Sequence, residues 1–417
     1  MLNLKGIMNS MKDRILTKTI KKACTTFPAV VVTGPRQSGK TTLLKNEFGK
    51  THTFVSLEDP NMRMRAKTDP LAFLEQYKPP VILDEIQYVP ELLSYIKTKI
   101  DQERTPGNWL LSGSQNFVLM DNISQSLAGR VAVLSLLPLT LSEQMNQGEN
   151  ALSITQWLST LSKLPQQQNK IEIAEWILRG AYPEIVTNKK VDRKLWCGSY
   201  IATYLERDVR NMAQVGDLNQ FELFLKQCAI RTGQLLNLTE LARDVGISVT
   251  TAKRWLSLLE TSYQVHLLQP YYKNLGKRLV KRPKMYFVDT AIATYLMGIH
   301  EAETLLNSPH FGALFESAVI NECVKRFTNF GDDKTIYFIR TQDNLEIDLA
   351  IENNQKLHLF EIKSAKTITP KHAVSLIKIQ KEWQQDVAQA SIISRADDNF
   401  LLVNGIMNYH WLTVLNA

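Results

Sequence analysis

The spacing of hydrophobic and polar positions changes several times along this chain of 417 residues. Between about residues 28 and 139, short apolar runs alternate with amphipathic stretches of helical length, which is the pattern of a parallel sheet covered by helices. The runs that predict strands are 28–34, 53–57, 81–86, 109–112 and 131–136. This part of the chain is therefore predicted to form an α/β domain.

The spacing becomes helical over residues 140–235, and two compact helices joined by a glycine turn follow after residue 236. Near residue 308 the pattern changes again, to a helix over 314–327 and three strand-like runs separated by polar turns. We therefore predict four regions: an α/β domain at 1–140, a helical region at 141–235, a winged-helix-like domain at 236–307 and a second α/β domain at 308–417.

The first candidate site is a glycine-rich loop that matches GxxxxGK[ST] between a predicted strand and a predicted helix. Its backbone N–H groups and the helix N-terminus suit phosphate groups. Lys40 is expected to neutralise charge on the β- and γ-phosphates, and the Thr41 hydroxyl to bind Mg²⁺. The predicted nucleotide-binding residues are Gly34, Pro35, Arg36, Gln37, Ser38, Gly39, Lys40, Thr41 and Thr42.

A chance glycine-rich turn is the alternative, but a second motif favours the phosphate loop. The apolar run that begins at residue 81 ends in Asp84 and Glu85. Asp84 is expected to hold Mg²⁺ through water, and Glu85 to polarise the attacking water. Together the two motifs predict ATP and Mg²⁺ as the cofactors.

Three further residues are candidates for sensing the γ-phosphate. Ser114 and Gln115 follow the fourth predicted strand, and Arg130 lies just before the fifth. In an oligomeric ATPase such an arginine can act on the nucleotide of a neighbouring molecule. The alternative for Arg130 is a surface arginine at a turn.

The helix pair at residues 238–259 has the spacing of a helix-turn-helix, in which Gly246 makes the turn and Ser248 caps the second helix. Basic residues are expected to face outward from this helix and from the basic stretch 273–284 that follows as a wing, where they could neutralise DNA phosphates. The alternative is a protein-interaction module with a solvated basic face. The candidate DNA-binding residues are Lys253, Arg254, Lys277, Arg278, Lys281 and Arg282.

Acidic residues alternate with apolar ones in two of the last predicted strands. Asp348 lies on one of these strands, Glu361 and Lys363 lie on the next, and Glu316 lies on the preceding helix. This order resembles the restriction-endonuclease-like fold, PD-(D/E)XK, although Ile347 stands where that motif has proline. The resemblance implies that Asp348 and Glu361 bind Mg²⁺ while Lys363 activates a water. The alternatives are a half-buried hairpin with no catalytic role and a binding module that has lost its nuclease activity.

Taken together, the motifs resemble a family of bacterial and archaeal AAA-type ATPases whose C-terminal half is a domain of unknown function. The resemblance covers all but about the first twenty residues, and it implies an AAA-like core in which Arg130 senses phosphate or acts as an arginine finger. The family usually has Gly-Gly-Tyr-Pro where this chain has Gly180-Ala181-Tyr182-Pro183. The matching segments are 34–42, 83–87, 111–115, 127–131, 179–184, 204–208, 277–289 and 361–363.

The net charge is +8, from 49 basic and 41 acidic residues. The positions of the basic residues along the chain are more informative than this total. Basic residues are concentrated in the first fifty residues, partly in the phosphate loop, and in the stretch 273–284, so anionic partners are expected. Four cysteines without zinc spacing and the absence of an apolar run of eighteen residues predict a reduced, soluble, cytoplasmic protein that enters no membrane.

The leading hypothesis is a Mg²⁺-dependent ATPase whose nucleotide cycle drives a C-terminal half that acts on DNA. The rival is a nucleotide-binding switch that recruits a protein partner through an inactive nuclease-like domain. Glu85 favours turnover, because a switch needs no carboxylate to polarise water. Self-association is a further expectation, since an arginine finger requires a neighbour.

Overall fold

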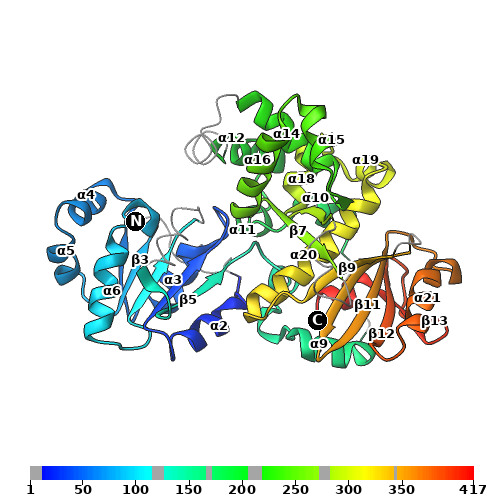
Figure 1. The fold of residues 1–417 in the computed structure, drawn as a ribbon, viewed down its shortest axis with the longest axis horizontal. Helices are drawn as coiled ribbons and strands as arrows, with labels where there is room; N and C mark the ends of the chain where they lie inside the picture. The colour runs from blue at the N-terminus through cyan, green and yellow to red at the C-terminus, as the bar shows by residue number, and fades with distance from the viewer. Residues whose placement is uncertain (1–11, 115–125, 166–170, 205–217, 272–281, 342–344) are drawn as a thin grey trace.

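The computed structural model describes residues 12–114, 126–165, 171–204, 218–271, 282–341 and 345–417. In Figure 1 a parallel sheet with its helices lies at one end of the molecule and a longer mixed sheet at the other. A group of helices in the middle of the chain lies above and between them. The described residues therefore form a mixed α/β structure, as the hydrophobic pattern predicts.

The N-terminal sheet has five parallel strands in the order β2-β3-β4-β1-β5. Each strand lies within the run that predicted it, and in a parallel sheet all the loops that follow the strands lie at one edge. The strands are β1 (Ala29–Thr33), β2 (Thr53–Ser56), β3 (Val81–Asp84), β4 (Trp109–Ser112) and β5 (Val131–Ser135).

Helices cover both faces of this sheet, because alternate strand residues point to opposite sides. Val31 packs into a core with α4, α5 and α6, whereas Val30 and Val32 pack into another core with α2 and α3. The helices are α2 (Leu16–Ala23), α3 (Lys40–Phe48), α4 (Pro60–Thr68), α5 (Pro70–Gln76) and α6 (Leu92–Gln102), with the short η1 (Ile86–Tyr88) after β3.

The middle of the chain is helical, as its spacing predicts. Its first elements are α8 (Leu141–Gln144), η2 (Gly148–Asn150), α9 (Ile154–Thr160), η3 (Leu161–Lys163), α10 (Ile173–Arg179), α11 (Pro183–Thr187), α12 (Arg193–Tyr204) and α14 (Leu218–Ile230). The predicted helix pair follows as α15 (Leu238–Val245) and α16 (Val249–Thr261). Gly246 ends α15 with φ +77°, and the Ser248 hydroxyl caps α16 by accepting from the Thr251 N–H.

The second sheet runs across the predicted boundary at residue 307. Its nine strands follow the order β13-β14-β12-β11-β10-β9-β7-β8-β6. The end of the helical region supplies β6 (Gln234–Leu235), and the helix-pair region supplies β7 (Val265–Pro270) and β8 (Lys284–Phe287). The C-terminal region supplies β9 (Ile336–Arg340), β10 (Glu346–Asn353), β11 (Lys356–Lys363), β12 (Val387–Ser394), β13 (Phe400–Val403) and β14 (Ile406–His410). The two regions join where Gln269 and Pro270 of β7 pair in parallel with Tyr337 and Phe338 of β9.

A long helix, α20 (Phe311–Phe330), packs against β11 and β8 of this sheet and also against α2 of the N-terminal domain. The remaining C-terminal helices are α18 (Thr290–Leu296), α19 (Ala302–Asn307), η5 (Pro370–Ala373), α21 (Val374–Glu382) and α22 (Trp411–Leu415). Among the described residues, no helix combines the length and the apolar character that a membrane crossing requires.

Candidate functional site

The phosphate loop connects β1 to α3 and depends on two glycines. Gly34 has φ +140°, and a Cβ there would lie 2.2 Å from the carbonyl oxygen of Leu136. Gly39 has φ +94° and immediately precedes α3. Since L side chains rarely adopt these conformations, both glycines are needed for the loop to curl in front of the helix N-terminus.

Two predicted metal-binding side chains meet at the carboxyl edge of the sheet. The Thr41 hydroxyl donates to Asp84 Oδ1 at 2.9 Å, and the Ser112 hydroxyl donates to the same oxygen. Burial raises the pKa of Asp84, and the two hydroxyl donors oppose this rise. A hydroxyl and a carboxylate are hard oxygen donors of the kind Mg²⁺ prefers, so these residues fit the ion predicted for them.

Lys40 is buried, and its Nζ donates to the carbonyl oxygens of Gly34 and Pro35 at 3.0 and 2.8 Å. These bonds turn the ammonium back into its own loop. A phosphate group in the loop would give the ammonium an anionic partner in the same place.

Glu85 and Ser114 are linked through Gln87, a residue to which sequence reasoning assigned no role. The Gln87 side-chain amide donates to the Glu85 carboxylate and, at 3.0 Å, to Ser114 Oγ. Its place two residues after the acidic pair was the signal that could have found it. Gln115, the other predicted sensor, lies outside the described residues.

A cleft of about 560 Å³ opens over the phosphate loop and is closed on its far side by the helical region. One wall includes Lys40, Thr41 and Glu85, and the other comes from α11 and α12. Three residues of that second wall lie in the segments 179–184 and 204–208 that carry the family resemblance, but no role was predicted for any of the five: Pro183, Glu184, Tyr200, Thr203 and Tyr204.

Arg14 is a second residue that the sequence did not single out. Its buried guanidinium donates to the carbonyl oxygen of Ser38 in the loop at 2.7 Å and to that of Leu137 at 2.6 Å. Its Nε lies 3.1 Å from Glu143 Oε1, and the Glu143 side chain is fully buried. Arg14 therefore holds the phosphate loop against the segment that leaves the sheet.

Arg130 lies at the opposite edge of the sheet from the phosphate loop. It precedes β5, whose first residue pairs with the first residue of β1, whereas the loop follows the last residue of β1. Its guanidinium pairs with Asp101 of α6 at 2.5 Å. Arg130 therefore does not reach the phosphate loop of its own chain in this structure, and the arginine finger and the surface arginine both stay open as predictions.

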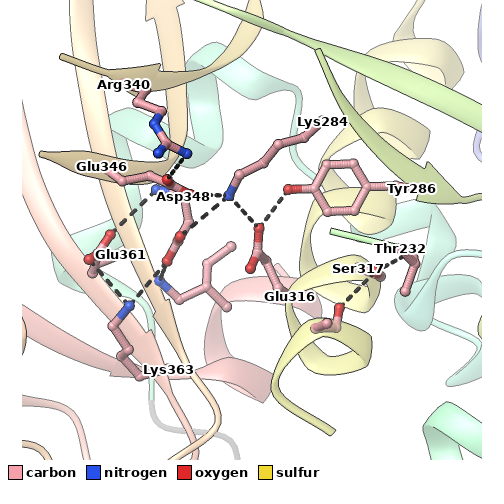
Figure 2. Close-up of polar contacts among 12 residues, drawn as sticks. Thr232, Lys284, Tyr286, Glu316, Ser317, Arg340, Glu346, Asp348, Glu361 and Lys363 are labelled. Atoms are coloured by element: carbon pink, nitrogen blue, oxygen red, sulfur yellow. Dashed lines mark hydrogen bonds and ion pairs between the residues drawn. The ribbon is translucent and has the colours of Figure 1, made fainter. Parts of the chain in front are cut away.

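The predicted acidic residues of the C-terminal half come together with two lysines (Figure 2). The carboxylate cluster consists of Glu316 on α20, Glu346 and Asp348 on β10, and Glu361 on β11. Lys363 Nζ lies 3.4 Å from Asp348 Oδ2 and 3.2 Å from Glu361 Oε1. The Asp348 carboxylate also accepts from the Ile362 N–H at 2.8 Å, which fixes it against the neighbouring strand.

The second lysine, Lys284 of β8, was not predicted to belong here. Its Nζ lies 2.6 Å from Glu346 Oε1, 3.1 Å from Glu316 Oε1 and 3.8 Å from Asp348 Oδ1. Figure 2 shows this side chain reaching between α20 and β10, beside Tyr286. Tyr286 donates its hydroxyl to Glu316 at 2.6 Å.

Burial and crowding shift the proton affinities in the cluster. Burial, with the negative charge of Asp348 as the second cause, raises the pKa of Glu361 to about 8 and that of Glu316 to about 7. Within the described part of the chain, no group of three or more His, Cys, Asp or Glu side chains has the arrangement of a metal site. In this cluster the lysine ammonium groups lie between the carboxylates.

The predicted DNA-binding residues are described only in part. Lys253 and Arg254 are exposed on α16, and Arg282 is exposed just before β8. Lys277, Arg278 and Lys281 lie outside the described residues. No contact brings the described basic residues to the carboxylate cluster.

Three regions of the chain match protein families. Residues 26–145 match the AAA domain, residues 170–303 a domain of unknown function (DUF8612), and residues 311–412 a second domain of unknown function (DUF4143). The chain therefore has an AAA-type domain, a class that binds and hydrolyses nucleotide, followed by a C-terminal domain of unknown function, as its motifs predicted. The winged-helix and nuclease-like assignments stay predictions.

Similar proteins extend over most of the chain. The uncharacterized protein Rv2008c of Mycobacterium tuberculosis is 29% identical over 390 residues, which cover 93% of this chain and 81% of the relative. The uncharacterized protein MJ1544 of Methanocaldococcus jannaschii is 21% identical over 409 residues, covering 93% and 87%. Among solved structures, the Walker-type ATPase paby2304 of Pyrococcus abyssi has a TM-score of 0.42 at 15% identity, covering 67% of this chain and 94% of that one.

Proposed function

We propose that the protein is a Mg²⁺-dependent ATPase whose nucleotide state is coupled to a C-terminal half that acts on DNA phosphodiesters. The observation that carries the ATPase part is that Lys40, Thr41 and Glu85 line one cleft and that Asp84 accepts a hydrogen bond from Thr41. The chemistry needs a cation at the phosphates, two oxygen ligands for a metal and a carboxylate beyond them.

Each side chain has a separate task in this proposal. Lys40 neutralises the β- and γ-phosphates, while Thr41 and Asp84 hold Mg²⁺, which would supply charge neutralisation on the same phosphates. Glu85 orients and polarises the attacking water. The hydrogen bonds of Gln87 keep the Glu85 carboxylate at the cleft and connect it to Ser114, the proposed sensor.

The proposal for the C-terminal half rests on the carboxylate cluster and on the exposed basic residues of α16. Asp348, Glu361 and Lys363 lie together as the nuclease-like motif requires, with Glu316 nearby on α20. Lys253 and Arg254 would bind the DNA backbone through charge, without reading its sequence. The α20 helix contacts both halves of the molecule and offers a route for coupling.

The test is the steady-state rate of ATP hydrolysis by the full chain, with and without duplex DNA at low salt. We expect Mg²⁺-dependent turnover that DNA stimulates, and a loss of at least about a hundredfold in Lys40→Ala, because the lysine acts on the charge that develops at the phosphates. An exposed lysine of α3, in Lys45→Ala, provides the matched control. Turnover that persists in Lys40→Ala would contradict the assignment of the site.

A second candidate function is a nucleotide switch that recruits a protein partner through an inactive nuclease-like domain. The position of Lys284 among three carboxylates favours it, because the ammonium lies where a catalytic metal would have to bind. Turnover that is indifferent to DNA, together with DNA that stays uncut in the presence of Mg²⁺, would support the switch over the coupled nuclease.

A further inference from the structure

Lys284 differs from the other basic residues near it in sequence, because its charge is directed into the protein. It is the last of the basic residues in the stretch 273–284, whereas Arg282, two positions earlier, is exposed. Only 3% of Lys284 is exposed, and its side chain points from β8 into the carboxylate cluster (Figure 2). This lysine therefore does not contribute to a basic surface.

The surroundings of the Lys284 ammonium are those of a bound cation. Three carboxylates surround it, and it also lies 5.5 Å from the centre of the Phe338 ring. Burial lowers the pKa of Lys284, but the three carboxylates outweigh burial and hold the pKa above its ordinary value. The group stays charged at every physiological pH.

A divalent cation in the cluster would have to bind the same carboxylate oxygens as the Lys284 ammonium, at shorter distances. Mg²⁺ binds carboxylate oxygens at about 2.0–2.1 Å and Mn²⁺ prefers the same oxygen donors, whereas the ammonium already contacts Glu346 and Glu316 by hydrogen bonds. Two cations in this space would repel each other across a poorly solvated gap. The ammonium and a metal ion are therefore alternatives for the cluster.

Lys363 is the matched comparison within the same cluster. Its side chain is 30% exposed and pairs with Asp348 and Glu361 from the outer side, in the position the nuclease-like motif gives to its lysine. Lys284 has no counterpart in that motif and comes from a different region of the chain. The two lysines thus hold distinct positions, since Lys284 pairs with Glu316 and Glu346 whereas Lys363 pairs with Asp348 and Glu361.

We propose that Lys284 is a built-in counter-ion that closes the carboxylate cluster to divalent metal in this conformation. The inference rests on the proposed function of the cluster as a metal-dependent phosphodiester site, and it names how that site is held inactive. Metal could then enter only when β8 moves its lysine away from α20 and β10.

The test is direct binding of Mn²⁺ to the nucleotide-free full chain, measured by electron paramagnetic resonance. All proteins carry Asp84→Asn, so that the proposed nucleotide-linked metal site does not contribute. We expect Lys284→Met to bind one Mn²⁺ at least about tenfold more tightly than the background protein, and Lys284→Met/Asp348→Asn to lose this gain. Lys363→Met, which leaves Lys284 in place, should show no comparable gain.

Removal of Lys284 takes one positive charge from a crowded group of carboxylates and could unfold the protein, so Lys284→Met/Glu346→Gln is a second variant with less excess negative charge. Thermal unfolding with and without Ca²⁺ is its independent readout: Ca²⁺ should stabilise this variant and leave the background protein unchanged. Tight Mn²⁺ binding by the background protein that Asp348→Asn abolishes would overturn the inference, whether or not the variants fold. So would folded variants that bind metal no better than the background.

The outcome also separates this inference from the proposed function. If Lys284→Met, in a chain with native Asp84, gains the metal site but leaves DNA uncut with Mg²⁺, the counter-ion role stands and the nuclease proposal fails. If it cuts DNA and Glu361→Ala abolishes the cutting, both stand.

Discussion

At the scale of single residues, the carboxylate cluster holds protons that an exposed surface would release. Burial is the main cause, and the charge of neighbouring Asp348 the second cause, of a rise that brings the pKa of Glu361 to about 8. Lys363 opposes it, since its ammonium lies 3.2 Å from the Glu361 carboxylate. Near neutral pH the cluster is therefore less negative than its four acidic residues suggest, and metal binding would have to displace a proton.

The first prediction concerns the pH dependence of stability. Folded Glu361 keeps its proton up to about pH 8, whereas an unfolded glutamate releases it near pH 4.5, so the folded state binds more protons between these values. The stability that this group contributes is present below pH 4.5 and is lost as the pH rises through 8.

Glu361→Gln cannot ionise, and its free energy of unfolding should therefore fall less steeply from pH 5 to pH 8 than that of the native chain, by up to about 1 kcal/mol per pH unit. Urea unfolding at several pH values measures this. Glu382→Gln, at an exposed position of α21, is the control and should leave the slope unchanged. Parallel slopes for the native chain and Glu361→Gln would contradict the prediction.

Residues within short motifs could be predicted, and residues that act across regions could not. Lys40, Thr41 and Asp84 were found because their motif specifies a local geometry in which a strand, a loop and a helix follow one another. Lys284 was grouped with its exposed basic neighbours, because nothing within a few residues of it indicates the carboxylates of α20 and β10. Arg14 and Tyr200 likewise depend on long-range packing.

At the scale of elements, two segments quoted for the family resemblance meet at the end of α10. The Asp289 carboxylate caps α18 by accepting from the N–H groups of Ala291 and Ile292, and it also accepts from the Ala181 N–H at 2.8 Å. Gly180 ends α10 with φ +68°, and a Cβ there would lie 2.5 Å from Asp289 Oδ1. The family usually has glycine where this chain has Ala181. The hydrogen bond to Asp289 is kept, because its donor is the backbone N–H of residue 181.

The second prediction compares two glycines with positive φ. Gly180→Ala should lower the free energy of unfolding by about 2–4 kcal/mol, because backbone strain and a clash with Asp289 add together. Gly246→Ala has a similar φ but meets no atom within 4 Å, so it should cost only about 1 kcal/mol. Chemical denaturation of both variants measures the difference, and equal losses would contradict the role of the Asp289 contact.

Helices and strands could be predicted where hydrophobic residues recur with a clear helical or strand spacing. The five parallel strands, the helix pair and α20 lie where the hydrophobic spacing places them. The continuous nine-stranded sheet was not predictable, since β7 and β9 are joined by only two residue pairs from distant parts of the sequence. The regions 236–307 and 308–417, which were predicted as separate winged-helix-like and nuclease-like domains, share this sheet.

At the scale of the whole molecule, the end of the helix pair touches the strand that leads into the phosphate loop. The Tyr263 hydroxyl lies 3.0 Å from Thr33 Oγ1 and 2.7 Å from Ser135 Oγ. Thr33 is the last residue of β1, directly before Gly34, and Tyr263 follows α16 by two residues. A change in the phosphate loop on nucleotide binding therefore has a direct contact through which it can reach the predicted DNA-binding helix.

This contact gives the last prediction, which concerns hydrogen exchange in α16. An ATP analogue that is not hydrolysed should slow exchange of the α16 amides in the native chain, because the nucleotide would fix the loop and the β1 end that Tyr263 contacts. Tyr263→Phe removes both hydroxyl contacts, so the response of α16 should be largely lost while the slowing in α3 is kept. The variant should lose only about 1 kcal/mol of unfolding free energy. Tyr95→Phe, a partly exposed tyrosine of α6, should respond as the native chain does, and Lys40→Ala should abolish the response everywhere. A full response of α16 in Tyr263→Phe would show that coupling runs by another route, of which the contact between α2 and α20 is the next to test.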